Sequence, residues 1–286
     1  MQTEIKNLYK KPLFWGIVGG VLLLGIVIVL IVELARPLPG VSQDNTTETE
    51  PPATTTEMTL PPPEANPLDL GDFALEGDYL TCLTAPSVLG IDVSEWQEEV
   101  DWQQVKAAGV EFVMIRAGWR GSVQGVLTED TYARANYAGA TAAGVQVGVY
   151  FFSQAISVAE AVEEAEFLLE IIRDWKLDMP VVYDWEFISA ESRTGNVSAR
   201  TLTECTKAFC ERIKQAGFQP MIYFNADQAA ERMYLRELTE YPFWLAQYDT
   251  VLNYPYKIDM WQYTETGTVP GISGNVDINL YFPWKE

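Results

Sequence analysis

The chain has 286 residues, a formal net charge of −21 and no histidine. The negative charge argues against nucleic acid or an anionic lipid surface as a partner of the soluble part. The absence of histidine excludes Ser-His-Asp and Cys-His nucleophile systems and His-containing zinc sites, so acid–base chemistry must come from Asp, Glu, Tyr, Lys or Cys.

The first feature along the chain is an uncharged apolar run at residues 13–32, LFWGIVGGVLLLGIVIVLIV. As a helix, this run would span roughly 30 Å, the thickness of a bilayer hydrocarbon core. Three lysines precede it, at positions 6, 10 and 11, whereas the following stretch is acidic. The positive-inside rule then predicts a single-pass signal anchor in the cell membrane, with residues 1–12 cytoplasmic and the chain after residue 32 extracytoplasmic.

A polar stretch follows the predicted anchor. Residues 33–66 are rich in Pro, Thr and Glu, and residues 37–88 hold nine acidic and no basic side chains. So few apolar groups cannot offset the entropy of ordering, which predicts a disordered, extended stalk over 33–66. Apolar residues return at 67–87, which we expect to form a lead-in to the domain at 88–286.

Strand-like and helix-like patterns alternate from residue 88 onward. Near-continuous apolar strands separated by amphipathic helices favour a parallel sheet buried on both faces, and eight strands in about 200 residues favour a closed barrel. The sequence therefore predicts an α/β fold, an irregular TIM-like barrel whose later strands lack helices between them. The expected strands are 87–94, 110–119, 145–152, 179–187, 218–224, 241–248, 257–264 and 275–278, with helices at 159–175 and 198–217.

Three cysteines occur, Cys82, Cys205 and Cys210, without a CxxC spacing. An odd number argues against a disulfide framework, and free cysteine is among the most buried residue types. We expect buried thiols, with the pairing of Cys82 with either of the other two left open.

The candidate chemistry centres on Asp184 and Glu186 in Tyr183-Asp184-Trp185-Glu186. Alternate residues of a strand project to the same face, and these two stand at the carboxyl end of their strand, where parallel barrels carry active sites. Neighbouring carboxyls push their pKa values apart, which yields the acid and the partner that glycosidic cleavage needs. From these residues alone, a structural or metal-bound pair fits equally well.

Other strand ends carry similar residues. Asp92 and Asp277 follow short apolar runs, so the pair becomes a predicted cluster of four acids. Aromatic side chains with polar tips match the flat apolar faces of sugar rings. The strand-end candidates for substrate binding are Arg116, Tyr150, Tyr223, Asn225, Trp244, Gln247, Tyr248, Trp261 and Gln262.

Four of these motifs together resemble glycoside hydrolase family 25, the lysozymes of the Chalaropsis and cellosyl type. They are GIDVSEWQ at 90–97, DWE at 184–186, WLAQY at 244–248, and MWQYT at 260–264 continuing to GNVDIN at 274–279. The resemblance covers about residues 88–284 and adds Trp96 and Trp185 to the expected substrate-binding residues. It implies a (β/α)5(β)3 barrel, no cofactor or metal, and hydrolysis of the β-1,4 bond between N-acetylmuramic acid and N-acetylglucosamine in peptidoglycan.

The same resemblance implies roles for the acids. Glu186 would be the general acid, and Asp184 would stabilise the 2-acetamido group or the developing positive charge. Asp92 and Asp277 would complete the cluster. One departure stands out: many relatives have Tyr-His after the third strand, where this chain has Tyr150-Phe151. A sugar contact by that histidine would be lost, which affects the expected substrate preference.

The leading hypothesis is a muramidase on the outer face of the membrane that remodels nearby cell wall. Two alternatives remain at this point. One is a hydrolase that binds Mg²⁺ or Ca²⁺ through Asp92, Asp184, Glu186 and Asp277. The other is a non-catalytic, membrane-tethered module that binds peptidoglycan. The sequence indicates no protein partner.

Overall fold

A computed structural model describes residues 60–284, and the predicted cytoplasmic segment, the predicted anchor at 13–32 and most of the predicted stalk lie outside these residues. Within the described range, no helix is both long enough and apolar enough to cross a membrane. The described helices and strands are β1 (Phe73–Glu76), β2 (Tyr79–Cys82), β3 (Val88–Val93), η1 (Glu95–Gln97), α4 (Trp102–Ala107), β4 (Phe112–Arg120), β5 (Leu127–Glu129), α5 (Ala133–Ala142), β6 (Gln146–Ser153), α6 (Val158–Ile171), β7 (Val181–Trp185), α7 (Ala199–Gln215), β8 (Pro220–Asn225), α8 (Ala226–Glu231), η2 (Leu235–Glu237), β9 (Phe243–Ala246), β10 (Met260–Gly267) and β11 (Val276–Tyr281).

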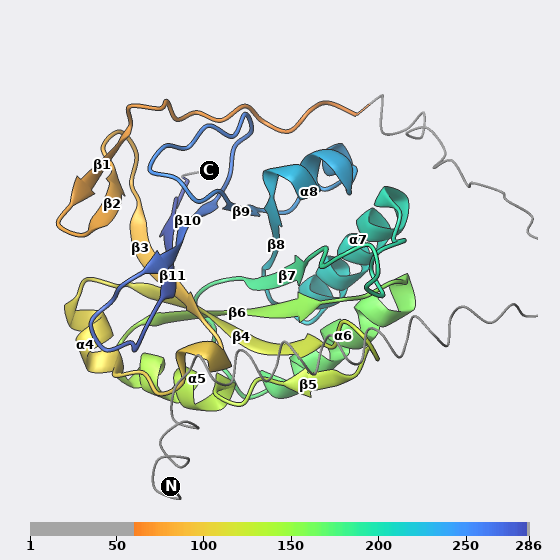
Figure 1. Ribbon diagram of the computed structural model, residues 1–286, viewed down its shortest axis with the longest axis horizontal. Helices are drawn as coiled ribbons and strands as arrows, with labels where there is room; N and C mark the ends of the chain where they lie inside the picture. Colours follow the sequence, from red (N-terminus) through yellow and green to blue (C-terminus); the bar gives the residue numbers. More distant parts are fainter. Residues whose placement is uncertain (1–59, 285–286) are drawn as a thin grey trace, which may run out of the picture. The chain divides into compact units, whose positions relative to one another are not determined.

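Eight strands close into a barrel in the order β3-β11-β10-β9-β8-β7-β6-β4, with β3 pairing β4, while β5 adds an antiparallel edge to β4. An α-helix follows each of the five strands β3, β4, β6, β7 and β8 (Figure 1). The last three strands have no α-helix after them in the described chain. This is a mixed α/β barrel with few helices, as the resemblance implied.

The last strand departs from a purely parallel sheet. β11 pairs antiparallel with both β10 and β3, whereas the pairs from β3 through β4, β6, β7, β8 and β9 to β10 are parallel. Only residues 268–275 connect β10 to β11, too few for a parallel crossover but enough for a hairpin. The start of β11 therefore lies at the barrel end where the parallel strands finish.

Two apolar layers hold the barrel. Between strands and helices, α6 and α7 bury residues such as Leu168, Leu202 and Phe209 against the outward-facing side chains of the sheet. Inside the barrel a separate cluster fills the centre: Phe112, Met114, Val182, Met221, Trp244 and Met260. A Cβ at Gly90 would lie 2.2 Å from the Phe112 ring, so glycine is needed there for this ring to fill the interior.

The lead-in covers the side of the barrel formed by the strands that lack helices. Phe73 of β1 packs edge-on against Trp261 and Phe282, with ring centroids 4.9 and 6.3 Å apart. The backbone N–H of Leu80 donates to the Tyr263 hydroxyl (3.3 Å). Figure 1 shows β1 and β2 beside β3, on the side of the barrel where β10 and β11 lie. The β1–β2 hairpin thus buries the surface that a helix would otherwise cover.

Residues 60–66, which the sequence assigns to the end of the stalk, also lie against the barrel. The Arg236 guanidinium donates to the Leu60 carbonyl (2.9 Å), and the Asn66 side chain donates to the Tyr254 carbonyl (3.0 Å). An isolated bridge pairs Ala65 with Tyr256. The segment that is attached to the barrel therefore begins no later than residue 60.

The three cysteines are free thiols, and Cys205 and Cys210 are buried in α7. Burial raises the pKa of the Cys205 thiol to about 12, so it is not ionised at neutral pH. These two cysteines are part of the packing between α7 and the sheet.

Candidate active site

A cleft of about 300 Å³ opens at the barrel end where the parallel strands finish. It contains all four acids of the predicted cluster. Its lining residues are Asp92, Ser94, Trp96, Gln97, Arg116, Tyr150, Phe152, Asp184, Glu186, Tyr223, Trp244, Tyr248, Gln262, Glu265 and Asp277.

Strand alternation on β7 decides which of its side chains enter the cleft. Val182 belongs to the interior cluster, Asp184 and Glu186 continue on the same face, and Tyr183 and Trp185 pack outward against the helices.

Asp184 is 4% exposed, and its Oδ1 has no hydrogen-bond partner among the described residues. A buried acceptor without a donor is costly, so this oxygen is suited to receive an N–H from a ligand.

Asp92, the last but one residue of β3, is the best-bonded acid of the four. Its Oδ2 accepts from the Gln262 amide (2.9 Å) and from the Asn279 amide (2.8 Å). Burial raises the pKa of Asp92 to about 6, and these two hydrogen bonds oppose that rise by stabilising the carboxylate. Two fixed hydrogen-bond donors therefore stabilise the ionised form of Asp92.

Asp277 stands directly opposite Asp92 in the antiparallel pair β11–β3. We expected it at the carboxyl end of a strand, but it is the second residue of β11, whose reversed direction brings its start to the cleft. Burial, followed by the charge of Asp92, raises the pKa of Asp277 to about 9. At neutral pH it keeps its proton and hydrogen-bonds to Asp92.

The two acids of the DWE motif both hold their protons more strongly than free carboxyls. Burial, then the charges of Glu186 and Asp92, raises the pKa of Asp184 well above its usual value, while Arg116 opposes the rise. Burial, then the charge of Asp92, raises the pKa of Glu186. Glu186 is less deeply buried than Asp184, so it is the more accessible proton donor of the two.

Aromatic side chains form the walls of the cleft, and hydrogen bonds fix most of them. The hydroxyls of Tyr223 and Tyr248 both donate to Gln262 Oε1, at 2.9 and 3.2 Å. The Trp244 indole donates to Asn279 Oδ1 (2.8 Å) and packs edge-on against Tyr223, with ring centroids 4.9 Å apart. Gln262 and Asn279 therefore orient both the aromatic wall and Asp92.

The rim differs from the walls because Trp96 is 77% exposed. It belongs to η1, whose N-terminus is stabilised by a capping box. Ser94 Oγ accepts from the Trp96 N–H, and Gln97 Oε1 accepts from the Ser94 N–H. Gln97 also donates to the carbonyl of Asn275 (3.2 Å), which lies in the loop between β10 and β11. An exposed indole on a fixed turn is a platform for stacking on a sugar ring.

Arg116 supplies the cationic edge of the cleft. Its guanidinium pairs with Asp130 (2.8 Å) and Glu95 (3.1 Å) and lies 4.7 Å from the centroid of the Trp119 ring. These partners hold the side chain in place beside the acids, so Arg116 moderates the negative potential of the cluster.

Four predicted substrate-binding residues lie outside the cleft lining. Trp185 is buried on the helix side of β7, where its indole donates to the Ala155 carbonyl (2.9 Å), and Trp261 packs against Phe73. Asn225 caps α8, and the Gln247 side chain donates to the Val251 carbonyl (2.6 Å). Trp185 and Trp261 each precede a cleft residue, and alternation turns their side chains to the opposite face.

Four lining residues were missed by the sequence analysis: Ser94, Gln97, Phe152 and Glu265. Alternation could have found Phe152, two residues after Tyr150, and the capping-box spacing could have found Ser94 and Gln97. Phe151, at the position where many relatives have histidine, is fully buried and packs edge-on against Phe167 of α6. Position 151 therefore contributes to the core of this chain and not to the lining of the cleft.

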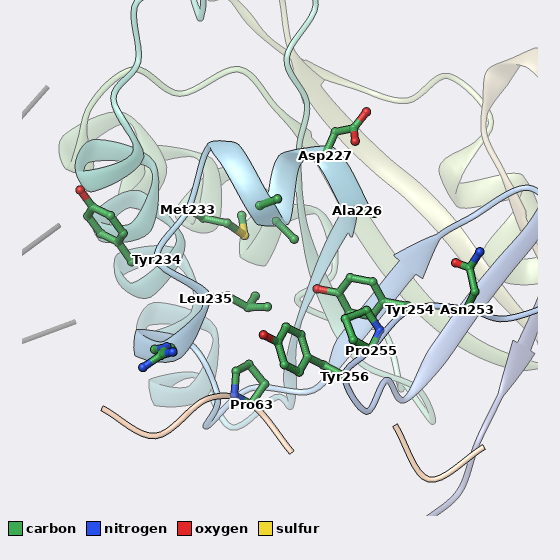
Figure 2. A pocket seen from close by; sticks show the side chains of 13 residues that line it. Pro63, Ala226, Asp227, Met233, Tyr234, Leu235, Asn253, Tyr254, Pro255 and Tyr256 are labelled. Carbon is green, nitrogen blue, oxygen red and sulfur yellow. The ribbon is translucent and has the colours of Figure 1, made fainter. Parts of the chain in front are cut away.

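A larger cavity of about 700 Å³ lies elsewhere, between α8, η2 and the loop before β10. Figure 2 shows Tyr254, Tyr256, Met233 and Leu235 around it, with Pro63 of the segment 60–66 at one edge. Among the described residues that line it, Asp227 has the only carboxyl side chain. Glycosidic cleavage uses a pair of carboxyls, and the smaller cleft contains such a pair, so it is the candidate active site.

The metal-dependent alternative requires a set of converging ligands. Within residues 60–284, no group of three or more Asp, Glu, Cys or His side chains is arranged to hold a metal ion. Of the four acids in the cleft, Asp277 hydrogen-bonds to Asp92, and two amides already occupy Asp92 Oδ2.

Residues 91–272 match the family described as Glycosyl hydrolases family 25. The chain belongs to glycoside hydrolase family 25. The matched range begins at the residue before Asp92 and includes Asp184 and Glu186, and the region that follows it supplies Asp277.

Similar proteins agree with this family assignment. Lysozyme M1 of Streptomyces globisporus is 28% identical over 204 residues, which cover 68% of this chain and 67% of that protein. The lysozyme structure from Streptomyces coelicolor superposes with a TM-score of 0.54 at 28% identity and covers 69% of this chain and 93% of that one. The autolysin LytC of Streptococcus pneumoniae, solved with a synthetic peptidoglycan ligand, gives a TM-score of 0.62 at 24% identity; the match covers 68% of this chain but only 47% of the autolysin.

Proposed function

We propose that this family 25 hydrolase is an N-acetylmuramidase that cleaves the β-1,4 bond between N-acetylmuramic acid and N-acetylglucosamine in peptidoglycan. The observation that carries the proposal is the placement of Asp184 and Glu186 on one face of β7, buried together in a cleft with aromatic walls. Lysozyme M1 and the lysozyme from Streptomyces coelicolor, both 28% identical to this chain, support the substrate class.

In the proposed reaction, Glu186 donates its proton to the glycosidic oxygen as the bond to C1 breaks; overall, one water is consumed, its hydroxyl ends on C1 and its proton restores the Glu186 carboxyl. Burial raises the pKa of this carboxyl and so keeps it protonated at a higher pH than an ordinary glutamic acid. The unpaired Oδ1 of Asp184 accepts the N–H of the 2-acetamido group and stabilises the positive charge that develops on the sugar. Asp92, held by two amides, supplies negative charge beside them.

The decisive experiment compares the full chain with its Glu186→Gln variant on purified peptidoglycan. Wild type should release muropeptides with reducing-end N-acetylmuramic acid, identified by mass spectrometry. The variant should lose about 10²- to 10⁴-fold in rate, the usual contribution of a general acid, with an unchanged Tm.

Glu191→Gln is the matched control, because Glu191 is an exposed carboxyl in the loop after β7. Full activity in Glu186→Gln would refute the assignment of the acid. Binding to peptidoglycan without turnover by wild type would favour the non-catalytic module, and activity lost in EDTA and restored by Mg²⁺ or Ca²⁺ would favour the metal-dependent hydrolase.

We further propose, from the sequence alone, that residues 13–32 anchor the enzyme in the cell membrane with the barrel outside. The chain between the anchor and the attached segment is then residues 33–59, which at the polyproline rise would reach at most about 85 Å. Such a tether would restrict hydrolysis to nearby cell wall. Fractionation of cells with and without residues 1–32, combined with protease digestion from outside, tests this proposal; release of the full chain with the soluble fraction would contradict it.

A further inference from the structure

We infer that Gln154 is a positioning residue, which holds the backbone of Glu186 and thereby the proton-donating carboxyl. This inference rests on the proposed function. Gln154 directly follows the last residue of β6, is fully buried, and does not line the cleft. Its amide nitrogen donates to the carbonyl of Glu186 (2.7 Å) and to that of Ser153 (2.9 Å).

The strand register explains why a side chain is needed there. β6 and β7 are parallel, with Ser153 paired to Trp185 at the end of the ladder, and the Val149 N–H donates to the Pro180 carbonyl. Donors of β6 recur every second residue, so continuing the ladder would place the Ala155 N–H on the Glu186 carbonyl. Ala155 instead donates to Ser153 Oγ (3.2 Å), because the chain turns away after Ser153.

The Gln154 amide therefore takes the place of the Ala155 N–H as donor to the Glu186 carbonyl. It adds one hydrogen bond between the two chain segments beyond the ends of β6 and β7. Both hydrogens of its amide are used, and its Oε1 accepts from the Thr194 hydroxyl (3.4 Å). Its own carbonyl accepts from Arg193, whose guanidinium also pairs with Glu160 (2.7 and 2.9 Å). The side chain that fixes Glu186 is thus itself fixed by the loop after β7 and by α6.

A second glutamine supports β7 from α8, the helix that follows the other neighbouring strand, β8. Gln228 of α8 donates to the Trp185 carbonyl (2.7 Å), and its backbone is held by the Asn225 cap (2.8 Å). Two buried side-chain amides therefore hold the backbone carbonyls of two consecutive residues, Trp185 and Glu186. Sequence reasoning gave neither glutamine a role.

The importance of this support follows from what the carboxyl itself lacks. In the described part of the chain, no side-chain hydrogen bond is formed by the Glu186 carboxyl, in contrast to Asp92 with its two amides. Glu186 also lies one residue beyond the end of β7. Its orientation therefore depends on its backbone, and misplacement of a catalytic group by about 1 Å costs on the order of 10²-fold in rate.

The test uses the full chain and measures kcat and KM on soluble, uncrosslinked glycan strands. Gln154→Met keeps the length and volume of the side chain but has no donor. We expect kcat to fall about 10- to 100-fold with KM within twofold of wild type, since the cleft lining is unchanged. Gln154→Leu, which also has no donor and adds no titratable group, should give the same separation of kcat from KM.

Thr206→Val is the matched control for a lost buried hydrogen bond. The Thr206 hydroxyl is fully buried and donates to the Leu202 carbonyl within α7 (2.8 Å). This variant should lose stability and keep its kcat. A kcat within twofold of wild type in either Gln154 variant, or an equal loss in Thr206→Val, would overturn the positioning role. Lack of hydrolysis by wild type would instead count against the proposed function.

Discussion

Asp92 and Asp277 face each other across the antiparallel pair β3–β11, and Asp277 keeps a proton that it shares with Asp92. Two amides hold the other side of Asp92. Two carboxyls in contact cannot both ionise cheaply in a buried site, so one stays neutral and donates to its partner. Burial is the main cause that raises the pKa values of Asp184 and Glu186, and the charge of Asp92 adds to the rise at both.

The first prediction concerns stability. The pKa of Asp277 is about 9 in the folded chain, against 3.8 for the free group, so between these values the unfolded state ionises while the folded state stays neutral. Stability contributed by this group therefore decreases as pH rises from about 4 to 9. Asp277→Asn removes the titrating carboxyl and with it this pH-dependent loss of stability, and the Asn amide can still donate a hydrogen bond to Asp92.

We expect Asp277→Asn to raise Tm at pH 8 by about 2–4 °C, the equivalent of roughly 1 kcal/mol, and to have a smaller effect at pH 5. Scanning calorimetry at both pH values measures it. Asp178→Asn, at an exposed carboxyl, is the control and should leave Tm unchanged both at pH 5 and at pH 8. A gain that is equal at the two pH values would contradict the titration of Asp277.

The second prediction concerns the pH dependence of kcat/KM. The rate should rise as Asp92 ionises near pH 6 and fall as Glu186 loses its proton at higher pH. Because the charge of Asp92 raises the pKa of Glu186, Asp92→Asn should move the falling limb of the residual activity to lower pH. A falling limb unchanged in this variant would show that the two groups do not interact.

The third prediction concerns Trp96, the exposed aromatic residue at the rim. Trp96→Ala should raise KM for glycan strands about 2- to 10-fold and leave kcat unchanged, because a stacking contact of about 0.5–1.5 kcal/mol is lost from ground state and transition state alike. Val123→Ala, at a comparably exposed apolar residue, is the control. An unchanged KM in Trp96→Ala would remove the indole from the binding surface.

The fourth prediction concerns the lead-in. Phe73→Ala removes the ring that packs against Trp261 and Phe282, and we expect a loss of about 2 kcal/mol and a Tm lower by about 4–8 °C. Leu75→Ala lies on the same strand but is 66% exposed, so its Tm should change little. Equal Tm values for the two variants would mean that the hairpin contributes nothing to the barrel.

The sequence determined the local features of this protein. Strand alternation places Asp184 and Glu186 on one face, and apolar runs alternating with helical patterns predict the barrel strands and the long helices α6 and α7 close to their observed bounds. These features repeat every two or 3.6 residues, so they can be recognised within a short window of chain. The motifs around Asp92, Asp184 and Glu186 likewise indicated the family.

Tertiary structure alone decided which residues meet. The reversed direction of β11 brings Asp277 opposite Asp92. The turn after Ser153 makes Gln154 the donor to the Glu186 carbonyl. Phe73 of the β1–β2 hairpin packs against Trp261, so this indole is part of the core. Each of these depends on a partner strand or loop distant in sequence, and the choice of partner follows from barrel closure and from satisfying buried backbone groups. No local pattern carries that information, which is why the roles of Trp261 and Gln154 emerged only from the fold.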